Sequence, residues 1–207
     1  MNDFDETVLE YYRQSNKLFN RFLSWEHCYE YFYTNKENID YDKAALMLFC
    51  YLASWGMLRN SFLMNHDYKL HINLIKTLIP KCYMLWDSNQ DSWDLIKEAD
   101  AIITDYYKNF KENNERISDT LRTKILLGIF GCVPAYDNFF KKSISKYKDI
   151  KLVSVFGENG FRKLWDFYNQ QIPLTLKLHN NPKIIYPPMK LIDMYFWQIG
   201  RQPIIYK

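Results

Sequence analysis

The sequence predicts an all-α protein folded as a single compact domain of 207 residues, and three observations support this fold class. Apolar residues recur at three- and four-residue steps in most of the long segments, which is the period of an amphipathic helix. Glycine and proline are scarce, at 6 and 7 residues, which argues against a turn-rich β-sandwich or barrel. The hydrophobic fraction of 48% supplies enough apolar surface for a core and excludes a disordered chain.

Five helices are expected in the first half of the chain. Asp3 or Asp5 can cap the first helix, and Gly56 is a natural end for the third. The third segment is apolar on nearly every side and is therefore expected to be a central buried helix. Pro80 should kink or split the fourth. The predicted helices cover residues 6–23, 24–35, 42–55, 68–85 and 93–110.

The second half is less regular, but capping residues divide it clearly. Ser118 or Asp119 can cap a helix that Gly131 and Pro134 end, and Asp137 can cap the next one. Residues 172–179 alternate between apolar and polar side chains as a short strand would, without a second such run to pair with. Further helices are predicted over residues 120–130, 138–147, 161–170 and 189–200. From these segments we expect one domain, residues 1–207, with eight to ten helices.

The net charge of +3 conceals an uneven distribution. Residues 1–120 carry 13 Lys/Arg and 19 Asp/Glu, a net charge of −6, whereas residues 121–207 carry 14 and 5, a net charge of +9. The domain can therefore be divided into an acidic lobe, 1–117, and a basic lobe, 118–207. A basic lobe suits an anionic partner such as DNA or RNA, although a lysine-rich solvated face would look the same. The candidate nucleic-acid-binding residues are Lys124, Lys141, Lys142 and Lys146.

Cysteine and histidine give no sign of a metal site or a cofactor. The 4 cysteines lie far apart in or beside apolar stretches, with no CxxC pair, and are expected to be buried reduced thiols. The histidines form no ligand cluster. No apolar run approaches the roughly 18–20 residues of a membrane helix, and the acidic start is unlike a signal peptide. We therefore expect a cytoplasmic protein with no membrane partner.

The most informative segment is TKILLGIFGCVPAYDNFF, residues 123–140. Gly128 and Gly131 in one apolar helix cost stability, unless another part of the chain comes close or the helix ends there. The segment presents Asp137 at a helix N-terminus, beside unpaired backbone N–H groups. This aspartate can be an ordinary N-cap, which stabilises a helix by about 1 kcal/mol, or a carboxylate that carries chemistry.

The C-terminal half of the chain resembles the helix-hairpin-helix DNA glycosylase superfamily. The resemblance lies in a phenylalanine–glycine pair that is followed by a proline and then by an aspartate at the start of the next helix. The combination of LASWGM, residues 52–57, with LGIFGCVPAYD is also similar to an uncharacterised bacterial protein group. The glycosylase resemblance extends to more distant, largely uncharacterised relatives, whose pattern is matched by Thr123, Lys124, Pro134, Tyr136 and Asp137 and, in the last helix, by Asp193, Met194 and Trp197.

The glycosylase resemblance implies that Asp137 is the catalytic carboxylate, which stabilises positive charge on the deoxyribose as the base leaves. It implies that aromatic residues such as Tyr136, Trp165 or Trp197 stack on an extruded base. Bifunctional members carry a lysine near the position of Ser118 and Asp119, so this chain would be a monofunctional hydrolase.

Two other functions remain open. A helical interaction protein without enzymatic activity would use Asp137 as a cap alone. The segment RNSFLMNH, residues 59–66, also resembles the loose arginine–histidine motif of the HEPN ribonucleases. In that case Arg59 would stabilise phosphate charge and His66 would act as general acid or base.

Overall fold

The computed structural model describes residues 3–17, 19–111, 116–145, 154–171 and 174–201. These ranges form nine α-helices and two short 3₁₀ helices, and they contain no strand beyond an isolated antiparallel bridge between Lys177 and Ile185. The fold class and the number of helices are therefore confirmed. The α-helices are α1 (Asp3–Ser15), α2 (Leu23–Thr34), α3 (Tyr41–Ser54), α4 (Leu70–Cys82), α5 (Trp93–Lys108), α6 (Asp119–Ile129), α7 (Asn138–Ile144), α8 (Glu158–Gln170) and α9 (Pro188–Arg201). The 3₁₀ helices are η1 (Phe62–Asn65) and η2 (Tyr83–Asp87).

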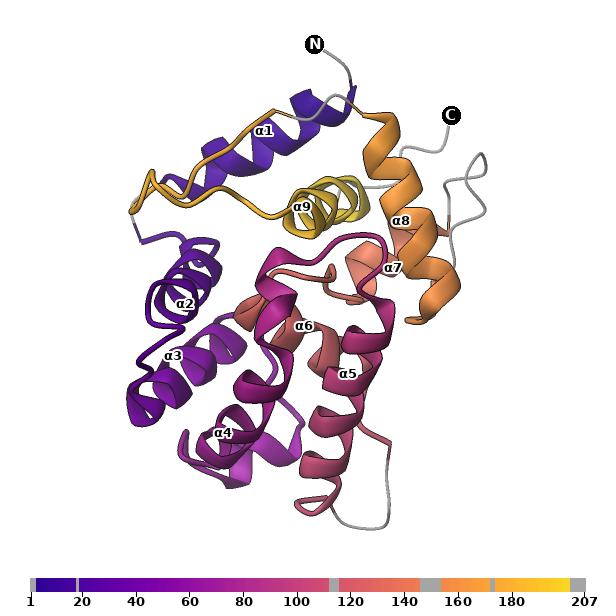
Figure 1. The fold of residues 1–207 in the computed structure, drawn as a ribbon. Helices are drawn as coiled ribbons and strands as arrows, with labels where there is room; N and C mark the ends of the chain where they lie inside the picture. The colour runs from indigo at the N-terminus through magenta and orange to yellow at the C-terminus, as the bar shows by residue number, and fades with distance from the viewer. Residues whose placement is uncertain (1–2, 18, 112–115, 146–153, 172–173, 202–207) are drawn as a thin grey trace.

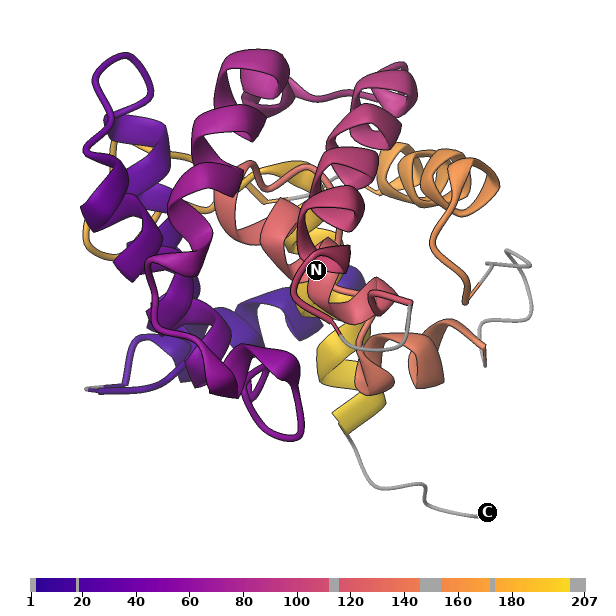
Figure 2. The same ribbon diagram turned by 90° about the horizontal axis from the view of Figure 1, so that it is seen from below.

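Two helices organise the packing of the others. Helix α6 contacts α2, α3 and α5, and helix α9 contacts α1, α7 and α8 (Figure 1). Seen from below, α6 lies inside the ring of surrounding helices (Figure 2). Every residue of α6 from Leu121 to Ile129 is buried. The N-terminal helices α1, α2 and α3 thus pack directly on α6 and α9 from the C-terminal part of the chain.

The prediction that the third helix is the central buried one is wrong. Helix α3 buries only the face that carries Ala44, Leu48 and Tyr51, and Leu46 on its other side is 42% exposed. Cys50 on this helix is also exposed, whereas the other three cysteines are buried. A helix that is apolar on all sides can be enclosed by other helices or lie at the surface. Its composition does not decide between the two, because the place of a helix in the fold depends on tertiary packing.

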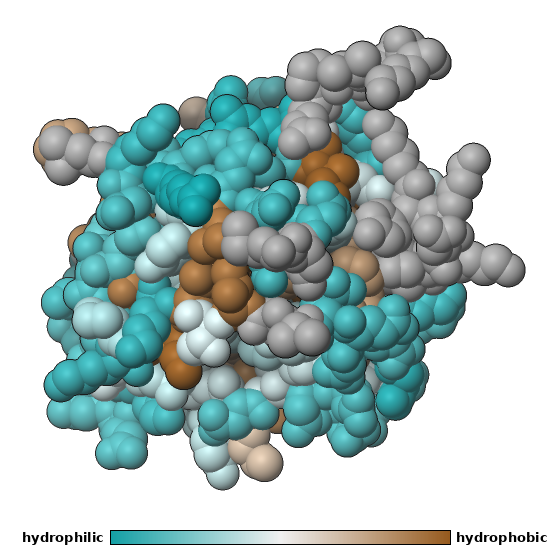
Figure 3. All heavy atoms as spheres, turned by 90° about the horizontal axis from the view of Figure 1, so that it is seen from above, coloured by the Kyte–Doolittle hydropathy of each residue, from teal (hydrophilic) through white to brown (hydrophobic). Residues whose placement is uncertain are grey.

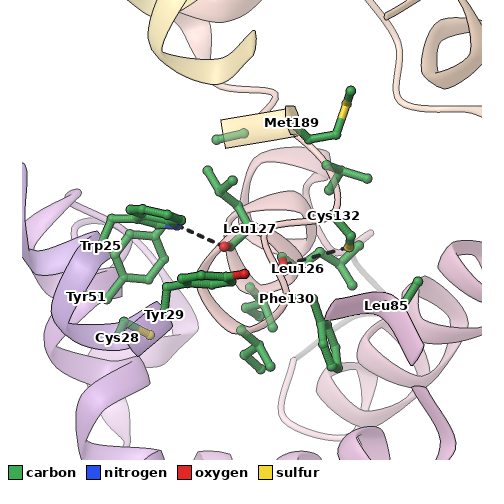
Figure 4. Close-up of a cluster of buried hydrophobic side chains, with 14 of the residues drawn as sticks. Trp25, Cys28, Tyr29, Tyr51, Leu85, Leu126, Leu127, Phe130, Cys132 and Met189 are labelled. Atoms are coloured by element: carbon green, nitrogen blue, oxygen red, sulfur yellow. Dashed lines mark hydrogen bonds between the residues drawn. The ribbon is translucent and has the colours of Figure 1, made fainter. Parts of the chain in front are cut away.

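The core around α6 is rich in aromatic side chains (Figure 4). Trp25 of α2 stacks on Tyr29, and its indole N–H donates to the Leu127 carbonyl oxygen at 2.9 Å. Gly128 is needed here because a Cβ at this position would stand 2.6 Å from the Tyr51 ring. The two aromatic helices α2 and α3 therefore approach α6 closely on one side.

Several boundaries differ from those predicted. Helix α1 ends at Ser15, whose hydroxyl donates to the Tyr12 carbonyl at 2.7 Å, and does not continue to residue 23. Pro80 lies within α4 and does not split it, and the chain continues as η2 after Cys82. The caps at Ser118 and Asp137 are confirmed, with both side chains accepting backbone N–H bonds.

The face seen from above is largely hydrophilic, with a band of apolar surface across its middle (Figure 3). Within the described ranges, no helix has the length and apolar character needed to cross a bilayer.

Candidate functional site

Asp137 forms the N-cap of α7 with one carboxylate oxygen, and its second oxygen takes no part in the cap. Its Oδ1 accepts hydrogen bonds from the backbone N–H groups of Phe139 and Phe140, both at 3.1 Å. Gly131, with φ of +68°, ends α6 and turns the chain toward this cap. The local sequence thus places the carboxylate between two helix ends, with Oδ2 pointing away from α7.

The buried loop before Asp137 is fixed by side chains from two helices. Thr123 of α6 accepts a hydrogen bond from the Tyr136 N–H at 2.9 Å, and Thr120 donates to the Tyr136 carbonyl at 2.8 Å. Asp193 of α9 accepts a hydrogen bond from the Ala135 N–H at 3.0 Å. Because these groups satisfy the backbone of the loop, the position of Asp137 is held by both α6 and α9.

Lys124 of α6 is the charged partner of Asp137. Its ammonium donates to Asp137 Oδ2 at 3.3 Å, and the two side chains are only 4% and 14% exposed. The same ammonium lies 4.7 Å from the centre of the Trp55 ring. Lys124 is therefore held between a carboxylate and an aromatic face, both of which attract a cation.

A second lysine–aspartate pair lies behind the first. Lys190 donates to Asp193 Oδ2 at 2.8 Å, and its ammonium lies about 5 Å from the rings of Tyr11 and Trp25. Both pairs line one small internal cavity, together with Tyr51, Leu127, Trp55 and Trp197. The interior of this all-helical core therefore contains a balanced set of two cations and two carboxylates.

The tyrosines near these pairs are held in the neutral form. Burial raises the pKa of Tyr11 and of Tyr51 well above the usual value for a phenol, and the negative charge of Asp193 raises both further. The charged chemistry of this region is accordingly carried by the two lysine–aspartate pairs.

Lys124 and Asp137 also face an open cleft. This cleft has a volume of about 460 Å³, and the same two residues line both it and the internal cavity. The cleft is lined by Arg21, Trp55, Met57, Arg59, Thr120, Lys124, Asp137, Asn138, Phe139 and Trp197. Asp137 is therefore a carboxylate that borders both the protein interior and a hollow at the surface.

The cleft continues into a hollow at each side. It shares Arg21, Phe139 and Trp197 with a hollow of about 380 Å³, and it shares Met57 and Arg59 with one of about 890 Å³. We call the three together the groove. Its basic lining residues are Lys17, Arg21, Arg59, Lys111, Lys124 and Arg201. Among the described residues that line the groove, Asp137 is the single carboxylate.

The outer cations of the groove are available to a ligand. Lys17, Arg21 and Arg59 are exposed, and no carboxylate of the described ranges lies within 4.0 Å of their charged nitrogens. Arg21 lies over the Trp55 ring at 5.1 Å, and Arg201 lies over the Trp197 ring at 5.6 Å. Cations that line a concave surface without neutralising carboxylates concentrate anions there.

The structure brings some of the predicted site residues together and separates others. Asp137, Lys124 and Trp197 all line the cleft. Tyr136 is 1% exposed and packs between the rings of Phe140 and Phe156, so it does not reach the groove. The half-buried Lys141 and Lys142 on α7 do not line the groove, and Lys146 lies outside the described residues.

Of the groove cations, the sequence predicts only Lys124 and, in the ribonuclease alternative, Arg59 as site residues. Lys17, Arg21 and Arg59 come from the lobe predicted to be acidic, and Arg201 comes from the end of α9. Lys17 and Arg21 lie with Arg13 in the stretch RQSNKLFNR, residues 13–21, which has no acidic residue, whereas Arg59 and Arg201 have no other basic residue within five positions. A weak signal was present in the pairing of Arg21 with Phe22 and of Arg59 with a turn after Gly56. The division into acidic and basic lobes therefore does not locate the positive surface.

Arg59 and His66 line the same hollow, the largest part of the groove. Gly56 and Asn60 both have positive φ, of +76° and +52°, and η1 starts only at Phe62. Arg59 consequently lies on a turn before η1 and His66 directly follows η1, so the two residues do not share one continuous helix.

The chain matches no protein-family model, no curated protein and no solved structure. Its function must therefore be inferred from the residues of the groove.

Proposed function

We propose that the protein binds a nucleic-acid strand along the groove and places a nucleoside at Asp137 for hydrolysis of its N-glycosidic bond. The observation that carries this proposal is the charge pattern. Six basic side chains line the three adjoining hollows of the groove, and Asp137, in the middle hollow, is the single carboxylate among their described lining residues. A phosphate backbone supplies the repeated negative charge that such a line of cations selects.

The position of Asp137 supports a catalytic role. The carboxylate borders the cleft, and Trp55 and Trp197 provide aromatic walls beside it. In the proposed reaction the bond from C1′ to the base nitrogen breaks and its electron pair leaves with the base. Asp137 stabilises the positive charge that develops on the sugar, water adds to C1′, and the proton of this water goes to the departing base.

Binding is tested by fluorescence anisotropy with labelled DNA and RNA oligonucleotides over a range of salt concentrations. We expect Kd to rise steeply with salt, because bound cations release counterions from phosphates. Arg21→Ala with Arg59→Ala should weaken binding strongly and reduce the salt slope by roughly 2, one for each lost phosphate contact. The matched control, Lys141→Ala with Lys142→Ala, removes the same charge from α7 outside the groove and should change binding little.

The reverse ranking of these two double variants would assign binding to α7, as the sequence alone predicts. If the unaltered protein binds no oligonucleotide at low salt, the proposal fails.

Excision is tested with oligonucleotides that carry deaminated, oxidised or alkylated bases. Abasic products are detected by strand scission in hot alkali. Asp137→Asn should abolish excision but retain oligonucleotide binding, because asparagine remains a good N-cap and removes only the charge. If the unaltered protein releases no base from any of these substrates yet binds them, the binding part of the proposal stands and the hydrolysis part fails.

The shared hollow of Arg59 and His66 favours a second candidate function, cleavage of RNA. His66 would take the proton from a 2′-hydroxyl, and the 2′-oxygen would attack phosphorus as Arg59 stabilised the phosphorane charge. The bond from phosphorus to the 5′-oxygen would then break, the 5′-oxygen would take a proton from water, and a 2′,3′-cyclic phosphate would remain. His66→Ala should then abolish cleavage, Asp137→Asn should not, and a DNA strand of the same sequence should stay intact.

A further inference from the structure

The turn between α1 and α2 holds an aromatic side chain in an unusual position. Phe19 is 92% exposed, the largest exposure among the large hydrophobic residues of the described ranges. Its φ is +58°, in the left-handed region that bulky residues rarely adopt. This turn projects from the edge of the molecule (Figure 2). The protein thus presents a phenyl ring to solvent at a backbone position that would suit glycine or asparagine better.

The unusual conformation is fixed by the next residue. The Asn20 side chain donates to the Gln14 carbonyl at 2.8 Å and accepts a hydrogen bond from the Phe22 N–H at 3.0 Å. The Asn20 N–H also donates to the Lys17 carbonyl at 3.0 Å. The turn is therefore built by defined hydrogen bonds. Residues held in such conformations concentrate at ligand-binding positions, since the surrounding structure must support their strain.

Phe19 lies beside one end of the groove. Its neighbours Lys17, Asn20 and Arg21 all line the hollow at that end, together with Arg201 and Trp197. Phe139, 40% exposed, lines the same hollow. Aromatic rings and basic side chains therefore line this part of the surface together, as they do in sites that bind single-stranded nucleic acids.

We infer that the groove takes a single strand of nucleic acid and that Phe19 stacks on a base where the strand leaves the groove at Lys17 and Arg21. This inference rests on the proposed function and specifies its substrate class. In a duplex both faces of every internal base are covered by neighbouring bases, so an exposed ring finds no base face there. In a single strand each base offers a face to an aromatic side chain, and the phosphates on either side can meet Lys17 and Arg21.

The test compares Phe19 variants in binding to a single strand, to a duplex of the same sequence and to vesicles that contain anionic phospholipid. Phe19→Ala and Phe19→Leu should each weaken single-strand binding by about 5-fold or more, the effect of losing one base–aromatic stack. Phe19→Trp should retain the affinity. Duplex binding should be weaker than single-strand binding and insensitive to all three changes. The affinities for an RNA and a DNA single strand of the same sequence are compared, which shows which of the two the groove prefers.

A second variant separates stacking from a structural role. Phe19→Asn should raise the thermal stability of the protein, because asparagine tolerates positive φ, while it weakens single-strand binding as Phe19→Ala does. The fluorescence of a 2-aminopurine base in the strand should be quenched when the strand binds the unaltered protein, and quenched less when it binds Phe19→Asn.

Three outcomes would overturn the inference. In the first, the unaltered protein and all Phe19 variants bind the single strand with equal affinity. In the second, the duplex binds more tightly than the single strand. In the third, substitution of Phe19 weakens binding to the vesicles alone. If the Phe19 substitutions leave the affinity unchanged but Arg21→Ala with Arg59→Ala still weakens binding, the proposed function stands and only this inference fails. If the unaltered protein binds no nucleic acid, the proposed function itself fails.

Discussion

Gly200 of α9 lies directly against the backbone of Phe139 in α7. A Cβ placed on Gly200 would stand 1.9 Å from the Phe139 carbonyl oxygen and 2.6 Å from its carbonyl carbon. This contact sets the distance between two helices that supply the groove, since α9 carries Trp197 and α7 begins just after Asp137. The sequence predicts a helix that ends at residue 200, but α9 continues to Arg201 and the glycine is required by the close approach of α7.

Gly200→Ala should therefore destabilise the protein by about 1–3 kcal/mol, because a backbone atom cannot move aside as a flexible side chain can. Urea unfolding followed by circular dichroism measures this change. Gly157→Ala is the matched control, because a Cβ at Gly157 meets no atom within 4 Å. Equal effects of the two substitutions would mean that the helix contact is not what restricts position 200.

The Lys124–Asp137 pair should be energetically coupled. Asp137→Asn leaves a buried ammonium without its carboxylate, and Lys124→Met leaves a buried carboxylate without its ammonium. The double variant leaves neither. A double-mutant cycle in urea unfolding should therefore give a coupling free energy of about 1–3 kcal/mol.

The exposed pair of Arg162 and Glu158, both 53% exposed, provides the comparison for this cycle. Its coupling should be only about 0.3–0.5 kcal/mol. A coupling between Lys124 and Asp137 no larger than this would show that the first pair is solvated and not part of the core.

Stability should fall in acid because of His71. Burial lowers the pKa of His71 to about 4 from an ordinary 6.5, and its Nδ1 lies 2.6 Å from the Tyr107 hydroxyl. Between these two pH values the unfolded chain binds more protons than the folded one, so the free energy of unfolding rises with pH through this window. The loss from pH 6.5 down to pH 4 should be about 3 kcal/mol for this group.

The measurement is the urea midpoint at a series of pH values in the unaltered protein and in His71→Leu with Tyr107→Phe. This double variant removes both polar partners, and its stability should fall less steeply in acid. Parallel pH profiles would exclude His71 as the source of the slope.

The cysteines should differ in reactivity. Cys50 is exposed, whereas Cys28, Cys82 and Cys132 are buried. Burial raises the pKa of Cys82 to about 11 and raises those of Cys28 and Cys132 as well, which keeps these thiols protonated. Iodoacetamide should therefore add once to the folded protein by intact mass, and Cys50→Ser should remove the adduct. More than one rapid adduct would mean that the core around α6 opens readily.

Local chemistry made the helix ends predictable. Ser118 and Asp137 cap their helices through the side-chain hydrogen bonds that their residue types favour, and Gly56 and Gly131 adopt the positive φ expected of a glycine at a helix end. Asp137 could be placed at a helix N-terminus for the same reason. These features depend on a few adjacent residues, so the sequence contains all the information that they need.

Features that depend on packing between distant segments could not be predicted. The burial of α6 rather than α3 depends on which helices surround each, and the long first helix stops at Ser15 because Asn20 binds the carbonyl of Gln14 across the turn. The groove is the clearest case, since Arg21, Arg59 and Arg201 come from three separate parts of the chain.

The hydrogen bond from the Ala135 N–H to Asp193 has a consequence for how the site comes into being during synthesis. Asp193 and Trp197 belong to α9, the last helix in the part of the chain that the structure describes. A nascent chain that lacks this helix on the ribosome can form α6 and the cap at Asp137, but it has neither the carboxylate that holds the loop nor one wall of the groove. The binding proposed at Asp137 should therefore require α9, and a chain that has not yet formed this helix should lack it.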